Sequence, residues 1–346
     1  RDLVRSRGLG DVYKRQVDVY QKYIKDLLQK KVKMPTSIGY GNGYEVSYMN
    51  SGKMTNKGWE FRVDAVPFEN RDWRVGFYFN IAHNENKITE MPDNYTEENY
   101  TFNNGEYAYR REEGRPMGSF YGYRYKGVCQ NKDATYARDA DGNVMKDISG
   151  NAIVMRNGTA TIAPGDALYE DINHDGVINQ YDIVYLGNSN PRFTGGAGVN
   201  VSYKQFKLSA IFYGRYGQDV VNSTRLNNES MRGIDNQSTA VLRRWRNEGD
   251  QTDIPRALYG EGYNTLGSDR FVEDASYLRL KSLSFNYRLP KKIIQRWGFS
   301  NIDVYVTGYN LFTWTKYTGQ DPEVKTENTY ARDSACLLYT SDAADD

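Results

Sequence analysis

Apolar and polar side chains alternate with a period of two along several stretches of the chain, the pattern of a β-strand with two different faces. In residues 58–66 the apolar positions are Trp59, Phe61, Val63 and Ala65, and charged residues lie between them. After a short polar turn the alternation resumes in residues 73–82, with Trp73, Val75, Phe77, Phe79 and Ile81 on one face. The two stretches predict a β-hairpin with one apolar and one charged face.

The same pattern recurs further along the chain. Two alternating runs meet at a tight turn within residues 195–214, and two more occupy residues 277–290 and 301–312, joined by the short connector 291–300. Residues 17–28 fit a further strand more weakly. These runs together predict seven strands.

Long connections separate the predicted hairpins. They cover residues 29–56, 83–190 and 215–275 and are rich in Asn, Gly, Asp and Tyr. Short turns at one end and long loops at the other are typical of an outer-membrane β-barrel, whose strands alternate apolar outside and polar inside. In such a barrel, residues 119–128 and 182–187 must both cross the membrane or both stay outside. We expect them outside, because their faces lack a clean aliphatic stripe.

Seven strands do not make a closed bacterial barrel, because single-chain barrels have even numbers of strands and an open edge exposes unpaired backbone groups. The chain is therefore expected to be part of something larger. The rival prediction is a secreted, soluble β domain that binds carbohydrate and carries one calcium loop. The two predictions differ in where Trp73, Phe77 and Phe79 point: into lipid, or into a dry core between two sheets.

The composition narrows the function classes. The chain has 45 basic and 44 acidic residues and a net charge of +1, so it lacks the broad basic footprint of a nucleic-acid-binding protein. It has 30 Tyr, 13 Phe and 5 Trp, with a mean hydropathy of −0.77. The sequence contains no run of about 18 apolar residues that could form a membrane helix, so only strands could meet lipid.

Both ends carry residues that do not read as natural protein. Residues 6–16 and 336–346 match translations of sequencing-library adapters, and the codons behind DVYKRQ and CLLYTS are reverse complements of each other. We therefore expect residues 1–16 and 336–346 to be adapter-derived and residues 17–335 to be the native segment. Cys129 is then the single native cysteine, which excludes an intramolecular disulfide and a Cys-based metal site.

Six blocks in order resemble one family, the SusC/RagA-type TonB-dependent outer-membrane transporters of Bacteroidetes. The matching blocks are residues 50–61, 113–128, 164–179, 187–214, 272–290 and 308–324. The resemblance covers nearly all of residues 17–335. It implies the C-terminal portion of a large β-barrel with long extracellular loops, from which the signal peptide, the plug, the TonB box, the early strands and the final strand are missing.

The resemblance also implies a function. Family members import nutrients, mainly oligosaccharides and in some cases peptides, across the outer membrane of Gram-negative, Bacteroidetes-type cells. They pair with a SusD-like lipoprotein and draw energy from the TonB complex, which engages the N-terminal part that is missing here. Specificity would lie in loops and plug, so the cargo is not named by these residues.

One segment, residues 171–182, has the ligand spacing of a calcium loop. Asp171, Asn173 and Asp175 supply side-chain oxygens, Val177 offers its carbonyl, and Asp182 holds the last position. Gly176 allows the sharp turn that such loops need. We expect a structural calcium ion that braces a long extracellular loop. The alternative is a cluster of Asx-turns without metal, since Asp, Asn and Gly favour turns in any case.

The remaining candidates are weaker. His83 and His174 are the only histidines, and neither lies in a zinc or nucleophile motif, so we expect no enzyme activity. Residues 238–250 predict a short helix with Arg243, Arg244 and Arg246 on a basic face, either solvated or contacting a partner lipoprotein. Most aromatic residues are expected at the lipid interfaces, with sugar stacking a less common role.

Overall fold

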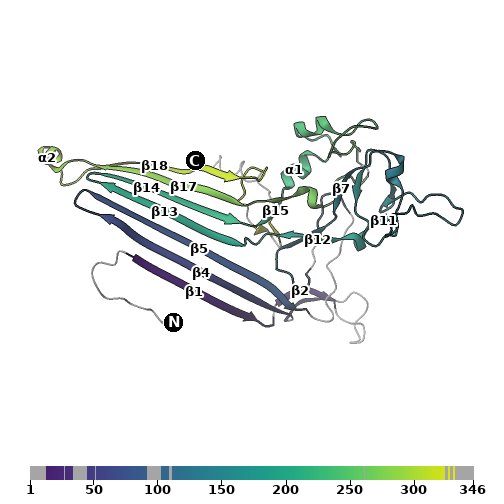
Figure 1. The fold of residues 1–346 in the computed structure, drawn as a ribbon, viewed down its shortest axis with the longest axis horizontal. Helices are drawn as coiled ribbons and strands as arrows, with labels where there is room; N and C mark the ends of the chain where they lie inside the picture. Colours follow the sequence, from purple (N-terminus) through teal and green to yellow (C-terminus); the bar gives the residue numbers. More distant parts are fainter. Residues whose placement is uncertain are drawn as a thin grey trace.

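The computed structural model describes residues 13–26, 28–33, 45–50, 52–91, 103–108, 111–260, 262–323, 326–327 and 330–331. One antiparallel sheet of seven long strands dominates the molecule (Figure 1). In spatial order the strands are β1 (Tyr13–Ile24), β4 (Lys53–Glu69), β5 (Trp73–Glu90), β13 (Phe193–Tyr203), β14 (Phe206–Tyr216), β17 (Tyr277–Arg288) and β18 (Asp303–Thr315). The seven predicted strands are therefore confirmed, and the predicted hairpins are the adjacent pairs β4–β5, β13–β14 and β17–β18.

The strand register gathers the apolar positions on one face of this sheet. Phe79 on β5 lies opposite Val63 on β4 and Ala197 on β13, whereas Asn80, the next residue, lies opposite Arg62 and Gly196. Because neighbouring residues of a strand point to opposite faces, each pairing keeps apolar with apolar and polar with polar. The alternation in the sequence therefore becomes two chemically distinct faces.

Short connections join the hairpins at one end of the sheet. At the β4–β5 turn the side chain of Asn70 accepts hydrogen bonds from the backbone N–H groups of Asp72 and Trp73. The β13–β14 turn has Lys204 at φ 51°, and β17 is joined to β18 through α2 (Lys291–Ile294) and η6 (Gln295–Trp297). The long connections lie at the other end (Figure 1), so the predicted asymmetry is confirmed.

The long connections fold into a body of their own, which we call the loop body: residues 103–108, 111–190 and 217–275. Its strands are β6 (Ser119–Gly122), β7 (Tyr125–Val128), β8 (Arg156–Asn157), β9 (Ala160–Thr161), β10 (Ala167–Tyr169), β11 (Val177–Ile178), β12 (Val184–Asn188), β15 (Asp219–Val221) and β16 (Val272–Asp274). Its helices are η2 (Lys132–Thr135), η3 (Gln180–Asp182), α1 (Ser223–Asn228), η4 (Thr239–Arg243) and η5 (Asp269–Phe271). The pairs β2 (Leu28–Lys33) with β3 (Glu45–Asn50) and β19 (Thr326–Glu327) with β20 (Tyr330–Ala331) complete the described strands.

The loop body has hydrophobic cores separate from the sheet. Tyr121, Tyr123, Tyr169 and Leu266 are at most 3% exposed and belong to one cluster, and Phe271 belongs to a second. Within the body, β6 pairs with β12 and β7 pairs with β10. The segments 119–128 and 182–187 therefore stay outside the seven-stranded sheet, as predicted.

Some local expectations need correction. In place of the helix predicted over residues 238–250, the structure has only the 3₁₀ turn η4 (Thr239–Arg243), which ends because Arg244 takes φ −57° and ψ 154°, outside the helical region. Strands β4 and β5 run further than the alternation predicted, into the polar residues 53–57 and 83–90. No helix among the described residues is long and apolar enough to cross a membrane.

β1 begins at Tyr13, four residues before the predicted start of the native segment, and pairs with β4 without a break across that boundary. Residues 1–12 and 336–346, both predicted to be adapter-derived, lie outside the described residues. So does Arg332–Ala335, the end of the predicted native segment.

Candidate functional site

The apolar face of the sheet is open to its surroundings. Trp73, Phe77 and Phe79 are 41%, 40% and 40% exposed, and Val199 on β13 is 41% exposed. A dry core between two sheets would bury these side chains almost completely. The rival prediction of a soluble sandwich required that burial, so the observed exposure favours a face that meets lipid.

Rows of aromatic side chains border this face at both ends. At the short-turn end, Trp73 contacts Tyr203 with ring centroids 4.3 Å apart, and Phe206 stacks on Tyr287 at 4.7 Å. These four residues lie in one continuous cross-strand row. Towards the loop body, Trp59, His83 and Phe193 form a second group, with centroids 5.3–6.2 Å apart. Two aromatic rows around an apolar band are the arrangement that outer-membrane strands show at the lipid interfaces.

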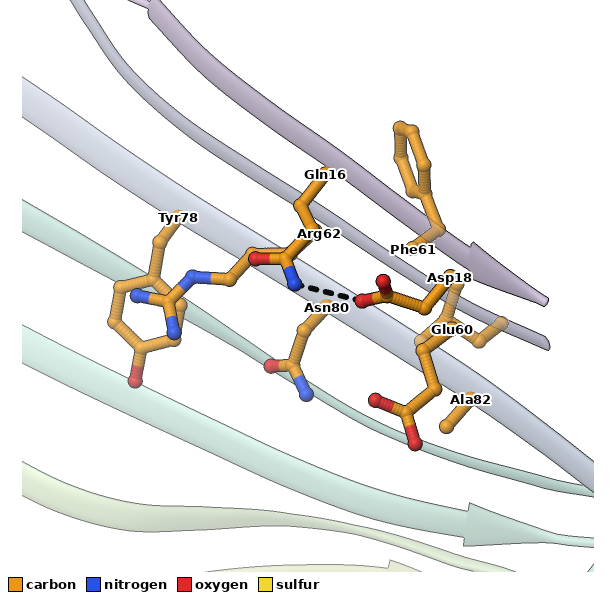
Figure 2. Close-up of a pocket in the computed structure, with 9 residues that line it drawn as sticks. Gln16, Asp18, Glu60, Phe61, Arg62, Tyr78, Asn80 and Ala82 are labelled. Atoms are coloured by element: carbon orange, nitrogen blue, oxygen red, sulfur yellow. Dashed lines mark hydrogen bonds between the residues drawn. The ribbon is translucent and has the colours of Figure 1, made fainter. Parts of the chain in front are cut away.

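The opposite face of the sheet is polar and carries a hollow of about 360 Å³. Figure 2 shows its lining side chains, which come from β1, β4 and β5. They are Gln16, Asp18, Glu60, Phe61, Arg62, Tyr78, Asn80, Ile81 and Ala82. Gln16 belongs to the segment predicted to be adapter-derived, and Phe61 and Ile81 are positions of the apolar face, so the polar wall of the hollow is formed by Asp18, Glu60, Arg62, Tyr78 and Asn80.

The charged side chains of the hollow differ in their partners. Arg62 forms a bidentate ion pair with Asp64, with Nε 2.7 Å and Nη2 3.0 Å from the carboxylate oxygens. Asp18 and Glu60 are opposite each other on β1 and β4, and Asp18 accepts a hydrogen bond from Gln16. The hollow thus offers carboxylate, amide and phenol groups that can hydrogen-bond a polar solute.

Further along the same face, polar side chains pair across the strands. Asn200 and Ser209 are hydrogen-bonded at 2.7 Å between β13 and β14, and Ser284 and Thr307 at 2.8 Å between β17 and β18. The polar face therefore continues from β4 to β18. Such a surface would line a wet interior if the sheet closed into a barrel.

In the loop body, ionic networks join segments that are distant in sequence. The guanidinium of Arg256 forms a bidentate pair with the buried carboxylate of Asp166, to which Asn264 also donates. Arg225 and Arg270 both pair with Glu229, which is 5% exposed. Buried charges that are paired in this way hold irregular segments in one arrangement.

The predicted calcium loop, residues 171–182, lies in the loop body and is held by hydrogen bonds between its own residues. Asp171 accepts hydrogen bonds from the backbone N–H of Gly176 at 2.8 Å and of Asp175 at 3.3 Å, and Asp175 accepts one from Val177 at 2.7 Å. Gly176 has φ 81°, as its place in the loop requires. Asn173 donates to Asp175 at 2.8 Å, so the first three predicted ligands are close together.

The last predicted ligand, Asp182, lies at the base of the same loop. It is fully buried and accepts hydrogen bonds from the backbone N–H groups of Ile172 and Asn179, both at 2.8 Å. Burial raises the pKa of this carboxyl group above its ordinary value. The carbonyl of Val177 accepts a hydrogen bond from Asn179. Among the described residues, no group of three or more His, Cys, Asp or Glu side chains is arranged to hold a metal, so calcium here stays a prediction.

Two further turns were missed by sequence reasoning although a signal was present. Asp139 and Asp147 each accept two backbone hydrogen bonds within a tight turn and a third from an Asn side chain four residues on. Gly142 and Gly150 take φ near 85° in these turns. The signal is the spacing of Asp-x-x-Gly-Asn, which recurs after eight residues.

No family model matches the chain. Among curated proteins, TonB-dependent receptor P3 of Formosa agariphila is 32% identical over 321 residues, covering 90% of this chain. TonB-dependent receptor SusC of Bacteroides thetaiotaomicron is 26% identical over 338 residues, covering 94%. The chain fits a fragment of a SusC/RagA-type TonB-dependent receptor. The predicted resemblance is confirmed, and the chain spans 29% of the length of each of these relatives.

Solved structures agree with the fold. The RagAB peptide transporter matches this chain with a TM-score of 0.62 at 26% identity, covering 90% of this chain and 31% of that one. The RagAB peptide importer in its open-open state matches with a TM-score of 0.66 at 24% identity. The predicted all-β, antiparallel class is therefore confirmed. The relatives are named as receptors, transporters and importers rather than as enzymes, in keeping with the non-enzymatic prediction.

Proposed function

We propose that the chain forms part of the wall and mouth of an outer-membrane, TonB-dependent importer of nutrients. The observation that carries this proposal is the sheet with two unlike faces. One face exposes an apolar band between aromatic rows, and the other is polar and hollowed. A water-soluble protein would bury the first face, whereas a barrel wall places it in lipid and turns the second towards the lumen.

Oligosaccharides or peptides are the proposed cargo. The lumen-side carboxylate, amide and phenol groups can hydrogen-bond either class, and the similar solved structures are those of a peptide transporter or importer, RagAB. A SusD-like lipoprotein is the proposed partner at the loop body, and the TonB complex would engage a part of the complete receptor outside this chain. These assignments follow the family resemblance.

The test uses the complete receptor that contains this chain, expressed in its native type of cell. The protein should fractionate with the outer membrane, need detergent for extraction, and support uptake of an oligosaccharide or peptide mixture that stops when the TonB complex is depleted. Ready extraction into buffer without detergent would contradict the membrane placement. Uptake that continues without TonB would contradict the energy source.

We also propose that calcium braces the loop of residues 171–182. The first three ligands are already gathered by hydrogen bonds, and Asp182 closes the base of the loop. In the complete receptor, Asp175→Ala should abolish a calcium-dependent thermal shift. Asp147→Ala is the matched control, because it removes the same kind of turn from a neighbouring loop. A calcium-dependent shift that survives Asp175→Ala would rule this loop out.

A further inference from the structure

The segment that follows the last long strand, β18, contacts both the loop body and the sheet. We call residues 316–323 the strap. Its first part contacts the loop body: Tyr317 is 6% exposed and packs with Val220 and Ala275 in a small apolar cluster. The backbone N–H of Thr318 and its hydroxyl donate to the carboxylate of Glu273, at 2.9 Å and 2.8 Å.

The second part of the strap contacts the sheet through one arginine. Arg279 lies on β17, and its side chain is 8% exposed. Its Nη2 lies 2.5 Å from a carboxylate oxygen of Asp321 and its Nη1 lies 2.8 Å from one of Glu323. The remaining nitrogen, Nε, donates to the hydroxyl of Thr313 on β18 at 3.0 Å. All three nitrogens of the guanidinium are therefore bonded, in a fork that only arginine offers.

A buried glutamine, Gln218, hydrogen-bonds both the strap and the residue just before Ser276 and β17. Gln218 is 3% exposed, and its amide donates to the carbonyl of Pro322 in the strap and to that of Ala275 beside β17. Asn222 at the start of α1 donates to the hydroxyl of Thr318. The strap is thus bonded to the sheet, to the loop body and to the junction between them.

The sheet does not need these side chains to hold together. Backbone pairing of β17 with β14 and β18 runs through residues 277–288 and uses no atom of the Arg279 guanidinium. If the strap is released, the long strands keep their ladder hydrogen bonds. What loosens is the junction of loop body and sheet, where the carboxylates that neutralise Arg279 would be lost and a nearly buried charge would be left without partners.

We propose that the strap is a latch that fixes the loop body to the polar face of the sheet, and that the ion pairs of Arg279 with Asp321 and Glu323 hold the latch closed. Release of the latch lets the loop body move as a unit while the barrel wall stays formed. This goes beyond the proposed import function, because it concerns the position of the mouth and holds for any cargo.

Hydrogen exchange of the complete receptor tests the latch. Arg279→Gln should raise the exchange rate of the strap and of the paired residues 219–221 and 272–274 by on the order of tenfold or more, the effect of removing charged hydrogen bonds from a local opening. Exchange in β17 and β18 should stay unchanged. Arg288→Gln is the matched control, because it breaks an exposed ion pair with Asp303 at the other end of the same strand.

Further variants separate a latch from a general packing role. Asp321→Asn combined with Glu323→Gln should reproduce the effect, and Arg279→Lys should not restore protection, because an ammonium group cannot bridge both carboxylates and Thr313. If Arg279→Gln prevents folding, Thr318→Val tests the other end of the strap. Equal exchange in the wild type and in the double carboxylate variant, or loosening of β17 and β18 together with the strap, would overturn the proposal.

Discussion

Replacing a residue of the apolar face by arginine should lower the free energy of unfolding by an amount that depends on how deep the residue lies in the bilayer. On β13, Phe193 and Tyr203 lie at the two aromatic rows, ten residues apart. That separation is about 34 Å along the strand, or about 26 Å across a bilayer for a strand tilted by about 40°. The value agrees with the apolar band of about 25 Å found in such barrels. Val199, between the rows, is therefore near the middle of the band.

The predicted magnitudes follow from this geometry. Val199→Arg should lower the free energy of unfolding by about 2–4 kcal/mol, and Tyr203→Arg, at the interface, by about 0–1 kcal/mol. Asn200→Arg points to the polar face and loses one hydrogen bond to Ser209, about 0.5–1.5 kcal/mol. The assay is denaturant unfolding of the complete receptor in lipid vesicles. Equal costs at Val199 and Asn200, or no dependence on depth, would refute the assignment of the faces.

Two more predictions concern the loop body. Burial alone would raise the pKa of Glu273, but hydrogen bonds from Thr318 and other donors hold it below its ordinary 4.5. The ionised Glu273 carboxylate therefore stabilises the contact between strap and loop body above pH 4.5, and this stabilisation is lost as the pH falls through the lowered pKa of the folded state. Glu273→Gln should remove this acid sensitivity from the hydrogen exchange of the strap. A Cβ at Gly267 would lie 1.9 Å from the carbonyl of Glu106, so Gly267→Ala should destabilise the loop body by about 1–3 kcal/mol or more, measured by protease sensitivity. Gly233→Ala, with only a 3.5 Å contact, is the control; equal sensitivity of the two variants would contradict this reasoning.

The sheet was predictable because its signal is local. A strand with one apolar and one polar face repeats every two residues, so Trp59 to Ala65 and Trp73 to Ile81 could be assigned without knowing their neighbours. The register then followed from the short turns, since a slip by one residue would turn Phe79 to the polar face. The ends of β4 and β5 were missed because polar residues extend the strands beyond the apolar band.

The loop body was not predictable for a related reason. Its cores join residues such as Tyr121 and Leu266, which are far apart in sequence and lie in segments without regular period. The latch depends on the same kind of contact, between Arg279 on a strand and Asp321 beyond the next strand. Composition indicated loops there, but only the folded chain brings these partners together.

The most direct test of the central claim probes what touches Val199. A nitroxide is attached at Val199→Cys or Asn200→Cys in the complete receptor in vesicles, with Cys129 replaced by alanine. Oxygen dissolved in lipid should relax the label at position 199, whereas a water-soluble nickel chelate should relax only the label at position 200. A label at position 199 shielded from both reagents would place that face in a dry protein core and contradict its placement in lipid.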